Sequence, residues 1–402
     1  MGLESNSVIR HAHLSKKLDP FGTSIFTEMS ALAARHGAIN LSQGFPDFAA
    51  PDWVKEAACR AIREDHNQYA PSHGVRPLRD AIAAKYRAMH GMEWDADFEI
   101  TVTTGATEAI HAVLTALLDP GDEVIAFEPF YDSYPACAAM NGARLTCVPL
   151  HAPSFEFDRE ELARAIRPST KAILLNTPHN PTGKVFTRSD LETIGQLAIE
   201  SGLWVITDEV YEHLPFGDAK HIPMASLPGM RDRTITINST AKTFSLTGWK
   251  VGYVLASREA TAAVRRVHQF VTFCTATPFQ HAMALAIAQA PEHEYYDRLR
   301  SEYIERRDLL VSALRRAGFR VEAPQGTYFA MADYRPIGFD GDDVAFCRWL
   351  TSKVGVAAIP PSSFYVHPEE GRGLVRFCFC KKVETIRAAG EKLASLSEVL
   401  AR

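Results

Sequence analysis

An alternation of two kinds of segment, which begins near residue 100, constrains the fold of this chain more than any other feature. Short apolar stretches typical of strands are separated by longer stretches whose apolar residues recur at helical spacing. The strand-like stretches are "EITVTTG", "DEVIAFEP", "ARLTCVPL", "KAILLNTP", "LWVITDE", "TITINST" and "VGYVLAS". Apolar strands that alternate with amphipathic helices predict a mainly parallel sheet with helices on both faces.

The pattern changes near residue 290. A long amphipathic helix is predicted in "PEHEYYDRLRSEYIERRDLLVSALRRAGF", and short strands between helices follow it. We therefore predict a large α/β domain at residues 46–295, a smaller α+β domain at residues 296–402, and an N-terminal segment, residues 1–45, that packs with the smaller domain. A chain of 402 residues, 46% of them hydrophobic, is long enough for two such domains.

Composition and termini argue against several classes of protein. With 43 basic and 48 acidic residues, a net charge of -5, the chain offers no basic field for nucleic acid or for a membrane surface. No apolar run is long enough to cross a bilayer, "MGLESNSVIRHAHLSKK" lacks the apolar core of a signal peptide, and Asn6 replaces the Ser or Thr of a myristoylation signal. We expect a cytoplasmic protein.

The cysteines favour a reducing compartment and no metal site. There are seven, an odd number, and they are scattered. The one close pair, Cys378 and Cys380, lies in an alternating apolar segment without further metal ligands nearby. We expect buried free thiols.

Residues able to perform chemistry follow the carboxyl ends of several predicted strands. Open α/β sheets bind ligands at that edge, so we expect these residues to lie together. They are Thr104, Gly105, Ala106, Thr107, Tyr131, Asn180, Asp208, Tyr211, Ser239 and Lys242.

Lys242, in "NSTAKTFSLTGWKVGY", is the candidate for covalent chemistry. An ordinary lysine has a pKa near ~10.4, and burial beside a second cation, here Lys250, favours its neutral form. A neutral buried amine forms imines with carbonyls, and pyridoxal 5′-phosphate (PLP) is the common aldehyde cofactor for such a lysine. A lysine without suitable neighbours is more often a surface charge, so the residues around Lys242 decide between a catalytic and a surface role.

Asp208 and the residues around it suit the ring of PLP. The cofactor needs a carboxylate at its pyridine nitrogen, and Asp208 at the end of "LWVIT" could provide one, although it also fits a helix N-cap. Tyr211, expected one helical turn further on, and Asn180 could hydrogen-bond the ring oxygen. Tyr131 fits either a ring-stacking role or the core.

Two further sites for anions are indicated. "TTGATEAI" is a strand, a turn of small residues and a helix start, whose free N–H groups bind anions, and Thr107, Ser239 and Lys250 could join them at a phosphate. The same loop taken alone fits a well-capped helix. Arg376 interrupts the apolar strand "GLVRFCF" and fits either a substrate carboxylate or a structural ion pair.

Together these segments resemble the class I/II aminotransferases of PLP fold type I, from about residue 20 to 395. The similarity is carried by "STAKTFSLTGWKVGY", "NTPHNPTGK", "TDEVYEH", "INLSQGFPDF" and "GTYFAMADY". The branch that holds kynurenine aminotransferase, glutamine transaminase K and bacterial methionine aminotransferase is indicated by "SIFTEMSALAARHGAINLSQGFPDF", "GVAAIPPSSFY" and "VRFCFCKK". The resemblance implies a large domain with a mainly parallel seven-stranded sheet, a smaller α+β domain, and PLP as cofactor.

The resemblance also implies a role for each candidate residue. Lys242 would hold PLP as a Schiff base, Asp208 would pair with the pyridine nitrogen, Tyr211 and Asn180 would contact the ring hydroxyl, and Tyr131 would stack on the ring. Phosphate would be bound by Gly105, Ala106, Thr107, Ser239 and Lys250, and by Tyr69 from the other subunit of a homodimer with shared active sites. The substrate carboxylate would be held by Gly44, Asn180 and Arg376. The side-chain pocket would include Phe26, Phe364 and Tyr365, which fit core packing equally well.

The expected activity is ping-pong transfer of an amino group from an apolar or aromatic L-amino acid to a 2-oxo acid. Methionine is the first choice of donor, and phenylalanine, tyrosine, kynurenine and glutamine are others. A PLP-dependent β-lyase that cuts C–S bonds in cysteine S-conjugates would use the same lysine and aspartate, so it stays open. A non-enzymatic PLP-binding sensor domain is the second alternative, but no basic helix-turn-helix segment accompanies the fold.

Overall fold

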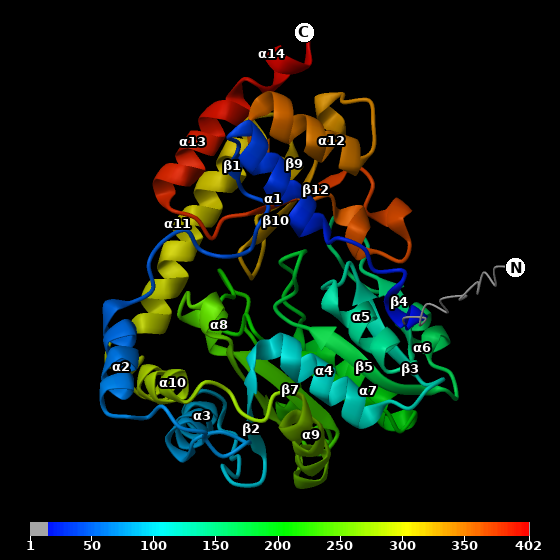
Figure 1. Ribbon diagram of the computed structural model, residues 1–402. Helices are drawn as coiled ribbons and strands as arrows, with labels where there is room; N and C mark the ends of the chain where they lie inside the picture. Colours follow the sequence, from blue (N-terminus) through cyan, green and yellow to red (C-terminus); the bar gives the residue numbers. More distant parts are fainter. Residues whose placement is uncertain (1–14, 402) are drawn as a thin grey trace, which may run out of the picture.

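A seven-stranded sheet lies at the centre of the larger part of the molecule in the computed structural model, which describes residues 15–401 (Figure 1). Only β8 runs antiparallel to its neighbours, which confirms the mainly parallel sheet. The strands, in their order across the sheet, are β2 (Ile100–Thr104), β8 (Val251–Leu255), β7 (Thr234–Ser239), β6 (Trp204–Asp208), β5 (Thr170–Asn176), β3 (Glu123–Glu128) and β4 (Arg144–Pro149).

Helices cover both faces of this sheet, because its strands are apolar on both sides. On β5, Ala172 and Leu174 face one apolar cluster, whereas Ile173 and Leu175 face another. The first cluster contains α4 (Gly105–Leu117), α5 (Ser133–Met140) and α9 (Arg258–Val271), and the second contains α6 (Arg159–Ala165) and α7 (Arg188–Glu200). A third cluster joins α2 (Asp52–Arg63), α3 (Arg76–His90) and α10 (Thr277–Gln289) to β2 and β8.

The C-terminal part is built around a smaller antiparallel sheet. Its strands, in order, are β12 (Leu374–Cys378), β10 (Phe329–Asp333) and β9 (Arg320–Val321). Its helices are α11 (Tyr295–Arg316), α12 (Asp343–Trp349), α13 (Val383–Ala394) and α14 (Leu396–Leu400).

The N-terminal segment packs with this C-terminal part. Helix α1 (Ile25–His36) packs against the helical turn at Leu350–Val354 and against β11 (Val356–Ala357), and β1 (Ile39–Asn40) pairs in parallel with β11 (Figure 1). Helix α1 starts at Ser24, whose hydroxyl accepts from the N–H of Thr27 at 3.3 Å, and stops at Gly37, where φ is 58°. The domain boundaries at residues 45/46 and 295/296 stay predictions.

Two local predictions were wrong. Tyr211 lies in a turn after β6 rather than in a helix, so Asp208 caps no helix. The alternating segment of Cys378 and Cys380 is not all strand, since β12 stops at Cys378 and Cys380 lies beyond its end. The first segment closes with turn bonds, from the N–H of Glu212 to the carbonyl of Glu209 and from that of Leu214 to the carbonyl of Tyr211. Beyond the second, Lys381 and Lys382 bond to Phe45 and Asp47, which local periodicity does not report.

Some predictions concern features at the margins of the structure. Those made for residues 1–14, on a signal peptide and on Asn6, lie outside the described residues. Within residues 15–401 no helix combines the length and the apolarity that a bilayer crossing needs. The seven cysteines are free thiols, and the described part of the chain contains no group of three or more His, Cys, Asp or Glu side chains suited to a metal ion.

Candidate active site

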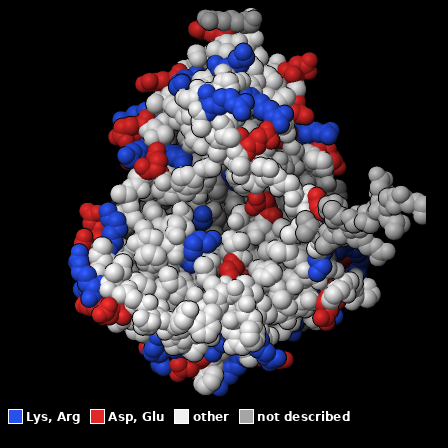
Figure 2. Space-filling view, in the orientation of Figure 1, with Lys and Arg blue, Asp and Glu red and all other residues white. Residues whose placement is uncertain are grey.

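One cavity, about 320 Å³ in volume, gathers most of the predicted site residues at the carboxyl ends of the large sheet. Figure 2 shows a hollow on this side of the molecule, with few charged side chains around it. The predicted residues that line the cavity are Phe26, Gly44, Gly105, Ala106, Thr107, Tyr131, Asn180, Asp208, Tyr211, Ser239, Lys242, Lys250 and Arg376. The sequence did not indicate Phe45, Asn176, Val210, Ala241, Thr247 or Phe329, which line it as well.

Four predicted residues do not line this cavity. Thr104 is the N-cap residue of α4 and lies next to the lining residue Gly105. Phe364 is buried just behind it and stacks on Phe26, with ring centroids 5.6 Å apart. Tyr365 is buried next to Phe364. Tyr69 is 83% exposed on the molecular surface, where its ring meets that of Phe273 edge-on.

Asp208 is a buried carboxylate at the end of β6. Tyr134 donates to Oδ2 at 2.8 Å, and the backbone N–H of Val210 faces Oδ1 at 3.4 Å. Burial raises the pKa of Asp208 to about 6, against the opposing effect of these two donors. A cationic ring nitrogen beside it would restore the charged form. Tyr134 was missed because its contact with Asp208 spans 74 residues, although "FEPFYDSYP" contains it.

Lys242 projects into the cavity from α8 (Thr240–Thr243), the short helix that follows β7. Ser239 caps this helix, since its hydroxyl accepts from the N–H of Ala241 at 3.1 Å. Burial lowers the pKa of the Lys242 amine, and the charges of Lys250 and Arg376 act in the same direction, while Asp208 opposes them. The environment therefore favours the neutral, nucleophilic amine.

An anion cradle forms where α4 begins. Thr104 at its N-cap makes no side-chain bond to the first turn, so no side chain of the cap occupies the N–H groups there. Gly105 has a φ of 76°, and a Cβ at this position would lie 3.2 Å from Nζ of Lys250. A Cβ on Gly252 would lie 2.6 Å from the carbonyl carbon of Gly105. Two glycines thus let a lysine approach the positive end of the helix, where a dianion such as phosphate is stabilised.

Tyr211 and Tyr131 supply aromatic surface to the cavity. Tyr211 packs edge-on against Tyr328, whose hydroxyl donates to the carbonyl of Gly44 at 2.7 Å. Burial raises the pKa of Tyr211 above its ordinary value, so it remains a neutral donor. Burial also raises the pKa of Tyr131, partly offset by its hydrogen bond with Thr107.

Arg376 is the buried cation of the opposite wall. Nη1 donates to Oδ1 of Asn180 at 3.2 Å and Nη2 to the carbonyl of Ser42 at 2.9 Å. Its Nε is buried without a partner, and no carboxylate of the described residues forms an ion pair with it. The structural ion pair considered from the sequence is thus not found there, and the guanidinium is available for a carboxylate that comes from outside the chain.

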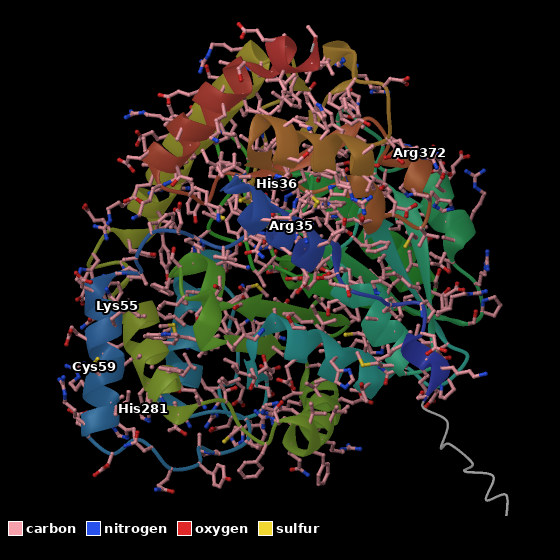
Figure 3. The ribbon with its side chains drawn as sticks, turned by 45° about the horizontal axis from the view of Figure 1, so that its top comes forward. Arg35, His36, Lys55, Cys59, His281 and Arg372 are labelled. Atoms are coloured by element: carbon pink, nitrogen blue, oxygen red, sulfur yellow. The ribbon has the colours of Figure 1, made fainter. Side chains whose placement is uncertain are left out.

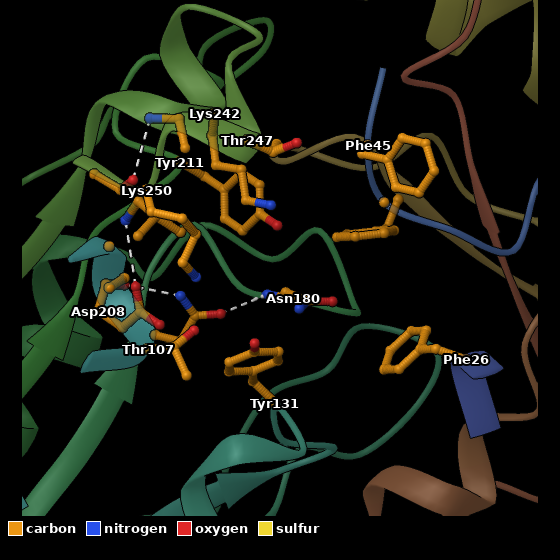
Figure 4. Close-up of a pocket in the computed structure, with 18 of the residues that line it drawn as sticks. Phe26, Phe45, Thr107, Tyr131, Asn180, Asp208, Tyr211, Lys242, Thr247 and Lys250 are labelled. Atoms are coloured by element: carbon orange, nitrogen blue, oxygen red, sulfur yellow. Dashed lines mark hydrogen bonds between the residues drawn. The ribbon is translucent and has the colours of Figure 1, made fainter. Parts of the chain in front are cut away.

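The cavity has a polar end and an apolar end. Figure 4 shows Asp208, Thr107 and Lys250 on one side, Phe26 and Phe45 on the other, and Asn180 and Tyr131 between them. The guanidinium carbon of Arg376 lies 4.2 Å from the ring centroid of Phe329, 5.0 Å from that of Phe26 and 5.2 Å from that of Phe364. A buried carboxylate, an amine with a lowered pKa and an anion cradle in one cavity fit PLP, and the apolar end is left for a substrate side chain.

Comparisons with known proteins agree with this geometry. The family model "Aminotransferase class I and II" matches residues 36–393. A probable N-succinyldiaminopimelate aminotransferase of Mycobacterium tuberculosis is 46% identical over 95% of this chain and 98% of its own, and a solved structure of that enzyme type from the same organism has a TM-score of 0.92. The methionine aminotransferase of Escherichia coli is 44% identical over 94% of this chain and 97% of its own. A kynurenine–oxoglutarate transaminase of Dictyostelium discoideum is 38% identical over 96% of both chains.

Proposed function

The chain belongs to the class I and II aminotransferases, PLP-dependent enzymes of fold type I, and on that premise we propose that it moves the amino group of an apolar or aromatic L-amino acid, methionine first, to a 2-oxo acid. One observation carries this choice of substrate. Arg376 has an unpartnered buried Nε and is surrounded by the rings of Phe26, Phe329 and Phe364. It forms a receptor for an α-carboxylate next to an apolar wall.

We propose the following roles for the residues of the cavity. When bound, PLP supplies an electron-withdrawing ring that stabilises negative charge at the substrate's Cα. Asp208 keeps the ring nitrogen protonated, and Tyr211 and Asn180 hold the ring oxygen. Tyr131 supports the ring face, while Gly105, Ala106, Thr107, Ser239 and Lys250 hold the phosphate. Their places around one cavity support these assignments.

Lys242 is proposed to act twice. Its amine would hold the cofactor covalently, and the same amine, when free, would take the proton from the substrate's Cα as general base. Gly44, Asn180 and Arg376 orient the substrate through its carboxylate, so that the Cα–H bond faces Lys242. Amino donor and 2-oxo acid use the same receptor in turn, which gives ping-pong kinetics.

The charges in the cavity favour a neutral side chain on the donor. Among the described residues that line it, the cations are Lys242, Lys250 and Arg376, and each already has a role. The side-chain carboxylate of aspartate, or the distal carboxylates of an N-succinylated diamino acid, would enter the apolar end, where no further cation is available to pair with them. Methionine fills such a space by its unbranched, adaptable side chain. Phenylalanine, tyrosine, kynurenine and glutamine are the next candidates.

We also propose a cytoplasmic homodimer with shared active sites. Tyr69, 83% exposed, and Phe270, 84% exposed, offer apolar surface to a second copy, and Tyr69 would reach the partner's phosphate site. Seven free thiols suit a reducing compartment. The overall charge of -5 offers no attraction for nucleic acid or anionic membranes.

An absorbance spectrum recorded before and after adding methionine, without any 2-oxo acid, tests the proposal. We expect the band of the lysine-bound cofactor to be replaced by that of the aminated cofactor, with one equivalent of 2-oxo acid released. An unshifted band would exclude methionine and direct the test to kynurenine, glutamine and N-succinyl-diaminopimelate. Pyruvate and a thiol released from a cysteine S-conjugate would show the β-lyase reaction instead. Failure of both the wild type and Lys242→Ala to bind PLP would refute the assignment of the site.

A further inference from the structure

The turn after β6 presents side chains to two separate regions. Asp208 and Tyr211 line the cavity, whereas Glu212, the residue after Tyr211, is buried away from it with 2% of its side chain exposed. The partners of Glu212 lie on three other elements of the large domain. None of these partners lines the cavity.

Oε1 of Glu212 receives all of the hydrogen bonds. Lys85 on α3, 5% exposed, donates to it and also to the hydroxyl of Tyr253 on β8, at 2.7 Å. Nδ2 of Asn238 on β7 donates to the same oxygen at 2.8 Å. The hydroxyl of Tyr253 lies 3.4 Å from it. One carboxylate oxygen therefore ties the turn to a helix and two strands.

This network continues into the second group of cofactor-binding residues. Oδ1 of Asn238 accepts from the N–H of Ser239 at 2.7 Å, and Ser239 caps the helix that carries Lys242. Glu212 thus directly follows Tyr211 in the chain, and its hydrogen-bond partner Asn238 directly precedes Ser239. The backbone N–H of Glu209 also donates to the carbonyl of Ile237 on β7 at 2.8 Å, so Glu212 adds a side-chain connection to a backbone one.

The surroundings of Glu212 stabilise its ionised form. Burial alone would raise the pKa of Glu212, but the charge of Lys85 and its hydrogen bond hold that pKa well below its usual range. An apolar pair of similar volume would fill the same space but accept no hydrogen bond, whereas a carboxylate accepts charge-assisted bonds that hold the turn in one place.

We propose that Glu212, paired with Lys85, is a positioning residue that sets Asp208 and Tyr211 against the ring of the cofactor. The inference rests on the proposed function, since it assumes that PLP occupies the cavity. It predicts that loss of either charge weakens the binding of the cofactor in addition to lowering the stability of the fold.

The test compares Glu212→Gln and Lys85→Met with Glu123→Gln. Glu123 is an equally buried carboxylate that Arg144 binds at 2.8 Å, but it lies at the amino end of β3, the edge of the sheet opposite the cavity. The dissociation constant of PLP, measured by equilibrium dialysis, should rise about tenfold or more in the first two variants, the size of effect found when groups that orient metal ligands are removed. The absorbance maximum of bound PLP should shift, and kcat should fall more than KM rises. Glu123→Gln should lower only the thermal midpoint of the apoprotein.

Two further variants keep the test decisive if a single substitution prevents folding. Lys85→Met combined with Glu212→Leu removes both charges at similar volume, and should fold yet bind PLP weakly. Lys85→Arg keeps the charge and should recover most of the affinity. The proposal is overturned if Glu212→Gln, or the double variant, keeps the wild-type PLP affinity and spectrum while its thermal midpoint falls as in Glu123→Gln. Wild-type protein that binds no PLP would instead refute the proposed function itself.

Discussion

Nη1 of Arg376 and Oδ1 of Asn180 lie 3.2 Å apart, and this bond connects β12 of the C-terminal part to the loop that follows β5 of the large sheet. The two residues are 196 positions apart in the chain. A carboxylate held between them would touch both parts of the molecule at once. If the proposed substrate role holds, substrate binding is coupled to the closeness of the two parts at this contact.

Arg376→Lys should raise KM for methionine about 10- to 100-fold with a smaller change in kcat, because an ammonium cannot form the paired bonds of a guanidinium to a carboxylate. Steady-state kinetics of the holoenzyme measures this. Arg306→Lys is the matched control, since Arg306 also lies over aromatic rings, those of Phe48 and Tyr303, outside the cavity. Equal effects of both substitutions would contradict the assignment.

Lys242→Ala should lower the rate of the half-reaction by at least ~10³-fold, since it removes the general base. The fold should persist, because burial disfavours the charged form of this lysine and its loss leaves no charged partner behind. Borohydride reduction of wild-type holoenzyme, followed by peptide mass spectrometry, should find the cofactor on Lys242. Lys55, which Figure 3 shows on the outer surface of α2, is the control: Lys55→Ala should keep full activity. Label on another lysine would refute the role.

Asp208→Asn should stabilise the apoprotein at neutral pH and abolish transamination. The folded pKa of Asp208, about 6, lies above the ordinary value of 3.8, so its burial costs nothing at low pH and the cost grows as pH rises through this range. A shift of this size corresponds to about 3 kcal/mol at most. Urea unfolding of the two apoproteins should show a stability difference at pH 7 that narrows at pH 5. A difference that does not depend on pH would show that the carboxylate carries no such cost.

Phe26→Ala should weaken the preference of the enzyme for large apolar amino donors over small ones. Phe26 lines the cavity and stacks on Phe364, so truncation removes part of the wall that a thioether or aromatic side chain would contact. The ratio of kcat/KM for methionine to that for alanine should fall about tenfold, within the range that lost apolar contact produces. Phe48→Ala, outside the cavity, should leave the ratio unchanged. An unchanged ratio in Phe26→Ala would place the donor side chain elsewhere.

The ion pair between His367 and Glu128 should stabilise the loop that carries Phe364 more at low pH than at high pH. Its Nδ1 contacts buried Glu128, which also accepts from the N–H of Val366 at 2.5 Å. The bond to Glu128 raises the pKa of His367, so this stabilisation is complete below the unfolded pKa and is lost as pH rises through the folded value. Because the side chain is 53% exposed, the effect is at most about 1 kcal/mol.

Cleavage by trypsin reports the local stability of this loop, since Arg372 is exposed in it (Figure 3). The rate of cleavage after Arg372, relative to that of His367→Gln, should be lower at pH 6 and should approach it at pH 8.5. Comparison at each pH cancels the pH dependence of the protease. If the ratio of the two cleavage rates does not change with pH, His367 does not stabilise the loop.

Much of the site could be predicted because its residues follow strand ends. Asp208 ends strand β6, and Asn180 and Lys242 follow β5 and β7 within about four residues. A parallel sheet brings such ends to one edge whatever the order of the strands. Alternation of strands and helices fixed the class of fold for the same reason. The identity of Arg376 as a buried cation also followed from local sequence, since a charge interrupted an apolar strand.

What the sequence alone determined is thus the kind of fold, the edge that binds the ligand and the residue types able to perform the chemistry. Only the tertiary structure decided which distant side chains meet there: Tyr134 on Asp208, Lys85 on Glu212, Phe329 beside Arg376, and no carboxylate of the described chain on Arg376. The physical reason lies in the order of the strands. The order of the strands across the sheet is β2, β8, β7, β6, β5, β3 and β4, which differs from their order in the chain. Residues adjacent in space therefore come from segments far apart in sequence. Local periodicity reports the type of each segment but not the segment with which it pairs.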